Sequence, residues 1–97
     1  MEFLVLTPRN VKNPERERII LEAVIEAAEA AGIERIIKRR GNVYSIGVYL
    51  NDGRGKILLY NDWDKDWGWR RIFNVIMSSM KLPKLNNSKS QLVLTPS

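Results

Sequence analysis

The sequence predicts an α+β domain with the element order β-α-β-β-β-α-β, in which two helices pack on one face of an antiparallel sheet. Two segments, 14–31 and 69–80, carry apolar residues at three- and four-residue steps, which is typical of amphipathic helices. Residues 43–50 instead follow a two-residue period, which is typical of a strand. The length of 97 residues suits one domain, so we assign residues 1–83 to its body and residues 84–97 to a loop and C-terminal edge strand of the same domain.

The first two elements are a strand and a helix. Residues 2–6 are apolar and partly β-branched, and Pro8 ends the run. Asn13 is suited to cap the free N–H groups of a helix that begins at Pro14, and Gly32 is suited to end that helix. The apolar stripe of this helix consists of Ile20, Val24, Ala27, Ala28 and Ala31.

Residues 33–40 fit two structures. Their isoleucines have helical spacing, but the run also fits a strand that leads into a hairpin turn at Gly41-Asn42. We favour the strand because the alternating run 43–50 follows directly. The sequence Asn-Asp-Gly-Arg-Gly then indicates a second turn, which connects to a returning strand at 56–60.

A second helix follows, with Asp66 as its candidate cap and Pro83 as the residue that limits it. Its buried stripe consists of Trp69, Ile72, Phe73, Ile76, Met77 and Met80. We expect a polar loop at 84–90 and a final strand at 91–95. The sequence Leu-Val-Leu-Thr-Pro occurs at 4–8 and again at 92–96, either by chance or because both are edge strands, so a monomer and a homodimer both stay open.

The composition excludes several function classes. The chain has no cysteine and no histidine, which removes disulfides, zinc-thiolate sites and the commonest general base. It has no phosphate-binding Gly-Lys loop and no catalytic carboxylate pair at a diagnostic spacing. It also has no apolar run near the roughly 20 residues of a membrane helix. We therefore expect a cytoplasmic, non-enzymatic protein without a cofactor or a membrane partner.

The charges are divided between two segments. The net charge is +5, yet residues 33–60 alone carry a balance of +4 and residues 14–32 a balance of −3. A one-sided basic field attracts polyanions such as DNA or RNA. We therefore predict that phosphates contact six cations, Arg35, Lys38, Arg39, Arg40, Arg54 and Lys56.

The tyrosines extend this nucleic-acid hypothesis. In the simplest register, Tyr49, Leu58 and Tyr60 point away from the helices, beside the arginines, and Tyr49 and Tyr60 would stack on bases. The inward face would then consist of Tyr44, Ile46, Val48, Leu50, Ile57 and Leu59. The alternative is that the two outward tyrosines only cover the sheet as a cross-strand pair, or are buried by the terminal strands.

Three alternating carboxylates, Asp62, Asp64 and Asp66, form a weak candidate for a hard cation. The run opens like an EF-hand loop, but glycine falls one place late and Phe73 replaces the closing glutamate. The other interpretation is helix capping and interaction with the helix dipole. A metal-dependent enzyme that uses these three residues is the third functional hypothesis.

Three tryptophans within seven residues supply a large apolar mass, Trp63, Trp67 and Trp69. They either clamp the junction between strand and helix or leave an exposed ring for a partner. Together with the edge strands, they support the second hypothesis, a protein-interaction module such as an accessory subunit or a viral or plasmid-borne inhibitor. Arg70 and Arg71 lie in the first turn of the second helix and, with Trp63 and Trp67, are secondary candidates for nucleic-acid contacts.

Residues 44–69 carry a resemblance. The stretch Tyr-Ser-Ile-Gly-Val-Tyr-Leu-Asn-Asp-Gly, followed by Leu-Leu-Tyr-Asn-Asp-Trp-Asp-Lys-Asp-Trp-Gly, resembles a family of small uncharacterised plastid and cyanobacterial proteins. This resemblance implies a fold and no functional residues. The helix-strand-strand-strand-helix order is also similar to that of double-stranded-RNA-binding domains, although Lys65, Arg70 and Arg71 do not reproduce the lysine-rich motif of that family.

Overall fold

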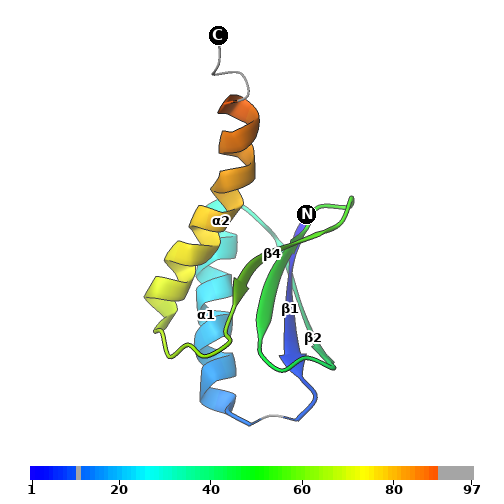
Figure 1. The fold of residues 1–97 in the computed structure, drawn as a ribbon, viewed down its shortest axis with the longest axis vertical. Coiled ribbons are helices and arrows are strands. Elements are labelled where there is room, and N and C mark those ends of the chain that lie inside the picture. The colour runs from blue at the N-terminus through cyan, green and yellow to red at the C-terminus, as the bar shows by residue number, and fades with distance from the viewer. Residues whose placement is uncertain (11, 90–97) are drawn as a thin grey trace.

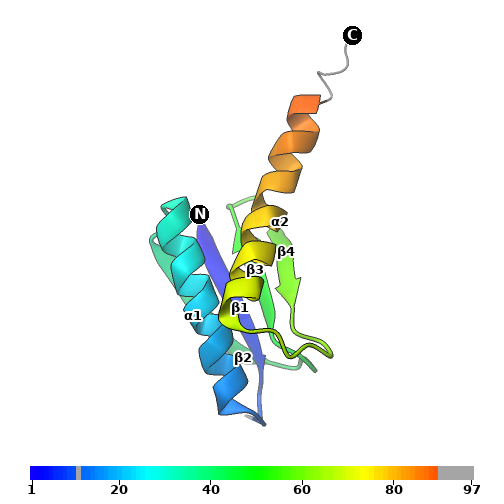
Figure 2. The same cartoon turned by 90° about the vertical axis from the view of Figure 1, so that its left-hand side faces the viewer.

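The computed structural model describes residues 1–10 and 12–89, which form four strands and two helices. Both helices lie on the same face of the sheet, and no described element covers its other face (Figures 1 and 2). The predicted α+β class and the packing of the helices on one face are therefore confirmed, whereas the strand predicted at 91–95 lies outside the described residues. The elements in order are β1 (Glu2–Pro8), α1 (Pro14–Ala31), β2 (Arg35–Gly41), β3 (Gly47–Asn51), β4 (Lys56–Asn61) and α2 (Trp69–Lys89).

The sheet is mixed, so the prediction of a purely antiparallel sheet is wrong. Its strand order is β2-β1-β3-β4, with β1 parallel to β2 and antiparallel to β3. Residues 33–40 contribute a strand, as favoured, but no hairpin turn forms at Gly41-Asn42 because β1 lies between β2 and β3. β1 suits the centre of the sheet because residues on both of its faces, such as Phe3 and Leu4, are apolar and buried. The charged β2 suits an edge.

The ends of α1 agree with the sequence. The Asn13 side chain accepts a hydrogen bond from the Arg16 backbone N–H at 3.2 Å, and Pro14 is the first helical residue. Gly32 closes the helix in the left-handed conformation, at φ 72°, which a residue with a Cβ adopts only at a cost.

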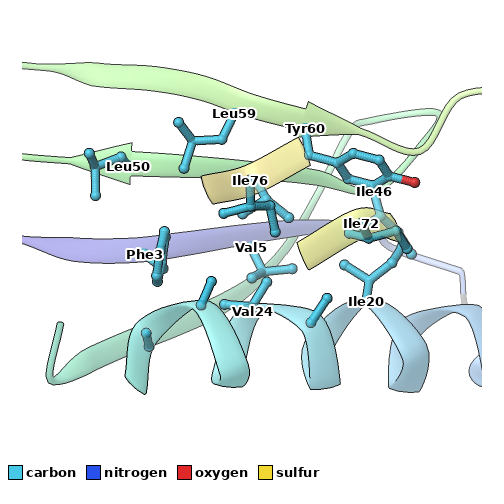
Figure 3. Close-up of a cluster of buried hydrophobic side chains, with 14 of the residues drawn as sticks. Phe3, Val5, Ile20, Val24, Ile46, Leu50, Leu59, Tyr60, Ile72 and Ile76 are labelled. Carbon is cyan, nitrogen blue, oxygen red and sulfur yellow. The ribbon is translucent and has the colours of Figure 1, made fainter. Parts of the chain in front are cut away.

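The core lies between the sheet and the two helices (Figure 3). Phe3 and Val5 of β1 pack there with Ile20 of α1 and with Ile72 and Ile76 of α2, and all five side chains are fully buried. The buried stripes predicted for both helices are thereby confirmed at these positions.

An irregularity between β3 and β4 changes which way Tyr60 points. Val48 pairs with Tyr60 but Tyr49 pairs with Leu58, so Leu59 has no partner residue on β3. The bulge turns Tyr60 into the core, where it is only 3% exposed, so its predicted outward orientation is wrong. The predicted inward position of Tyr44, which is 94% exposed in the loop before β3, is wrong as well. Ile57 pairs with Leu50 and points to the helix side as predicted, although it is 40% exposed.

The helix α2 begins and ends later than predicted. It begins at Trp69, and the Ile72 N–H donates to the Gly68 carbonyl at 3.2 Å. Gly68 therefore directly precedes the helix, in place of the predicted cap Asp66. The helix continues through Pro83 to Lys89, over residues that were predicted as a loop. A proline removes one helical hydrogen bond and crowds the preceding turn, which weakens a helix without forbidding its continuation. The predicted boundary of the domain body at residue 83 therefore falls inside α2.

Candidate functional site

The side of the sheet that neither helix covers is called the open face below (Figure 1). Side chains alternate along each strand, so the neighbours of the buried Phe3 and Val5 point to this face. The strand register then places matching residues of the other strands beside them. The open face carries Arg35, Ile37 and Arg39 of β2, Glu2, Leu4 and Leu6 of β1, Gly47, Tyr49 and Asn51 of β3, and Lys56 and Leu58 of β4.

The same alternation sends two of the predicted phosphate contacts to the helix side. Lys38 Nζ lies 3.2 Å from Glu17 Oε1, and Arg40 Nη1 lies 3.1 Å from Glu17 Oε2. Arg40 also donates to the Thr7 hydroxyl and to the Pro8 carbonyl. The hydrogen bond from Arg40 is the main reason that the pKa of the nearly buried Glu17 carboxyl is lowered. The charge division seen in the sequence is thus partly an internal pairing of α1 with β2, and Lys38 and Arg40 do not join the open face.

The remaining cations gather at one end of the open face. Arg39, Arg54 and Lys56 line a hollow of about 490 Å³, whose lining also includes the apolar Leu4 and Ile37 and one carboxylate, that of Glu2. Lys56 Nζ lies 5.7 Å from the centre of the Tyr49 ring, within the range of a cation–π contact. Arg35 lies nearby on β2, with its Nε 3.7 Å from Glu2 Oε1. Four of the six predicted cations therefore lie at this face or at the β3–β4 turn beside it.

The other end of the open face is aromatic. Tyr44 and Trp63, which is 64% exposed, meet edge to face with ring centres 6.5 Å apart. Together with Tyr49 they line a hollow of about 330 Å³. The Tyr49 ring extends over Gly47, since a Cβ built on Gly47 would lie 3.0 Å from Tyr49 Cε1. We define these three side chains as the aromatic trio; the sequence interpretation missed Tyr44 because it extended β3 by four residues.

Two further cations lie beyond the aromatic trio. Arg9 and Lys12 line a hollow of about 430 Å³ that also includes Tyr44, and no acidic side chain lines it. Arg9 Nε donates to the Asn42 side-chain carbonyl at 3.0 Å, which leaves the terminal nitrogens of the guanidinium without a carboxylate partner among the described residues. The sequence interpretation passed over both cations because they stand singly in a polar loop.

The candidate cation ligands do not converge. Asp62 accepts hydrogen bonds from Arg16 Nε, at 3.2 Å, and Arg16 Nη2, and from the Tyr60 hydroxyl. Within residues 1–10 and 12–89, no group of three or more acidic, histidine or cysteine side chains is arranged to hold a metal ion. Asp62 therefore pairs with an arginine instead of joining Asp64 and Asp66 around a cation.

Arg16, Asp62 and Tyr60 form what we call the anchor, because it ties the start of α1 to the segment between β4 and α2. Arg16 also donates to the Trp67 carbonyl through Nη1, at 2.6 Å. Burial, followed by the hydrogen bond to Asp62, raises the pKa of the Tyr60 hydroxyl, so Tyr60 stays neutral in the physiological range. The anchor fixes the segment that carries Trp63.

The other two tryptophans clamp the junction between β4 and α2. Trp67 lies on Tyr60, with ring centres 6.1 Å apart, and Arg71 stacks on it at 3.9 Å. Trp69 meets Phe73 edge to face, and Arg70 lies 5.4 Å from the Trp69 ring centre. Both arginines of the first turn of α2 are thus engaged by tryptophan rings, and Trp63 is the tryptophan that faces solvent.

Comparisons with protein-family models, with curated proteins and with solved structures found no match to this chain. The resemblances proposed from residues 44–69 and from the element order therefore stay predictions. In the described part of the chain, neither helix is both long enough and apolar enough to cross a membrane.

Proposed function

We propose that this protein is a non-enzymatic binder of single-stranded nucleic acid and that the open face is its binding surface. The observation that carries the proposal is the juxtaposition on one helix-free face of a cation-lined hollow and an aromatic trio with two strongly exposed rings. Single-stranded nucleic acids are bound by this combination, because aromatic rings stack on unpaired bases and cations track the phosphates.

The order of the hollows suggests a path for the strand. Phosphates at one end would lie against Arg39, Arg54 and Lys56, and the following bases would stack on Tyr49. Further bases would reach the edge-to-face pair of Tyr44 and Trp63. Arg9 and Lys12 would meet the phosphates beyond this pair, since Tyr44 lines both hollows.

Fluorescence anisotropy tests the proposal with labelled DNA and RNA strands of about ten nucleotides, within the usual span of such sites. We expect single strands to bind more tightly than duplexes of the same sequence. If about four phosphates are neutralised, the logarithm of the affinity should fall with the logarithm of the salt concentration with a slope of about −3. Absence of binding at low salt would contradict the proposal.

The variant Tyr49→Ala tests the stacking step. Loss of one aromatic platform costs about 1–3 kcal/mol, so the affinity should fall roughly 5- to 150-fold while the salt slope is unchanged. Arg18→Ala is the matched control, because Arg18 is an exposed cation of α1 that pairs with Glu15 on the helix side. An equal affinity of Tyr49→Ala and wild type would contradict the role of the open face.

A protein-interaction module is the second candidate. One observation favours it: Ile57 and Leu58 are 40% and 52% exposed on β4, an edge strand of the sheet. The first strand, which was an edge strand under one explanation of the repeated Leu-Val-Leu-Thr-Pro, lies between β2 and β3. If this candidate is correct, the wild-type protein should not bind oligonucleotides at low salt. The substitution Leu58→Lys should then abolish its capture of a protein partner.

A further inference from the structure

We infer that Asn61 makes the aromatic hollow selective for bases with a carbonyl oxygen at pyrimidine C4 or purine C6, which are uracil, thymine, guanine and hypoxanthine, over cytosine and adenine, which carry an amino group there. This inference rests on the proposed function, since it concerns which base enters the hollow of the aromatic trio. Asn61 is the last residue of β4, and it lines that hollow together with Ser45.

The orientation of the Asn61 amide is set by two donors. The Trp63 backbone N–H lies 2.8 Å from Asn61 Oδ1, and the Ser45 hydroxyl donates to the same oxygen at 2.9 Å. A backbone N–H requires an acceptor, so the amide oxygen and not the amide nitrogen must face Trp63. Both lone pairs of Oδ1 are then in use.

The Asn61 amide nitrogen remains for a ligand. Nδ2 donates to no side chain or backbone group among the described residues. In that same part of the chain, every buried side-chain nitrogen or oxygen has a hydrogen-bond partner. Because Nδ2 has none, it is not buried and is accessible to solvent. The hollow therefore offers a fixed N–H donor beside the aromatic rings.

A fixed donor without a free acceptor discriminates among bases. The usual pairing of asparagine with adenine uses both the amide oxygen and the amide nitrogen, and here the oxygen is already occupied. A carbonyl oxygen at pyrimidine C4 or purine C6 can accept from Nδ2, whereas the amino group that cytosine or adenine carries at that position would bring a second donor against it. A donor that the bound base shields from water without accepting from it weakens binding, so we expect roughly 5- to 100-fold discrimination.

Homopolymer pairs with rings of equal size test the inference by anisotropy. The wild-type protein should bind oligo-uridine more tightly than oligo-cytidine, and oligo-inosine more tightly than oligo-adenosine. Asn61→Asp keeps an acceptor for Trp63 and Ser45 but replaces the donor with a second oxygen, which accepts from amino groups. We therefore expect this variant to reverse the order within each pair.

Asn10→Asp is the matched control, because it adds the same charge to the neighbouring hollow that Arg9 and Lys12 line. It should weaken all four oligonucleotides by a similar factor and keep their order. Equal wild-type affinities within each pair, or an Asn61→Asp variant that only reproduces the uniform loss of the control, would overturn the inference. If the proposed function itself is wrong, none of the four oligonucleotides will bind, which distinguishes that outcome from a loss of base selectivity. The wild-type comparison needs no variant and decides the question even if Asn61→Asp does not fold.

Discussion

Replacement of Arg16 by methionine should destabilise the fold by about 2–4 kcal/mol. The Arg16 and Asp62 side chains are only 16% and 9% exposed, and the guanidinium reaches both carboxylate oxygens and the Trp67 carbonyl. Removal of one partner from a fully buried ion pair costs about 3–5 kcal/mol, because the other charge is left unpaired, and the remaining exposure of this pair reduces that range. For a domain of this size, the loss corresponds to a decrease in Tm of roughly 10–25 °C.

Urea denaturation followed by tryptophan fluorescence measures this cost in a double-mutant cycle with Asp62→Asn, which keeps an acceptor for the Tyr60 hydroxyl. The double variant should be more stable than the sum of the two single losses predicts, by about 1–3 kcal/mol. Arg18→Met is the control, since its pair with Glu15 is exposed and should change stability by less than about 0.5 kcal/mol. A loss for Arg16→Met as small as that of the control, or strict additivity in the cycle, would refute the reasoning.

Two further substitutions test the packing on each side of the sheet. The lowered pKa of Glu17 means that its stabilising contribution is complete above its unfolded pKa of about 4.3 and is lost as the pH falls through the lower folded pKa. The stability difference between wild type and Glu17→Gln, measured by urea denaturation, should therefore shrink as the pH falls from neutral to about 3, and a difference independent of pH would contradict this assignment. In Gly47→Ala, the new methyl group would lie 3.0 Å from Tyr49 Cε1 and should displace the ring. We expect a stability loss of about 1 kcal/mol and an oligonucleotide affinity close to that of Tyr49→Ala, so an unchanged affinity would show that the position of the ring is irrelevant.

Local features of the fold could be predicted from the sequence because they depend on neighbouring residues. Asn13, Pro14 and Gly32 mark the ends of α1 through their own backbone and side-chain preferences. The buried Ile72 and Ile76 of α2 follow from helical periodicity. The choice of a strand for residues 33–40 was also correct, since β2 covers most of that run.

The strand pairing could not be predicted in this way, because it depends on contacts between residues far apart in the chain. β1 pairs with β2 and β3 at once, which separates two strands that are neighbours in the sequence. The bulge that turns Tyr60 into the core likewise appears only when β4 is aligned with β3.

The candidate site could be predicted only in part, because its residues also come from strands that are far apart in the chain. Arg39, Arg54, Lys56 and Tyr49 reach the open face or its rim, as a simple alternation suggests. Lys38 and Arg40 do not, because the acidic α1 lies above their side of β2 and supplies Glu17 as a partner. The exposed pair of Tyr44 and Trp63 joins the loops at the open end of the β3–β4 hairpin, and it was missed because the predicted strand began at residue 43 and included Tyr44.

The most direct test of the open face is an NMR titration of the wild-type protein with a single-stranded oligonucleotide. The three indole N–H signals report separately on the aromatic trio and on the junction, because Trp63 is exposed whereas Trp67 and Trp69 pack against the core. We predict that the Trp63 indole signal and the Tyr49 ring signals shift in proportion to the bound fraction, and that the amide signals on the outer side of α1 do not. Shifts confined to the helices, or no shift at saturating oligonucleotide at low salt, would contradict the assignment of the open face as the binding surface.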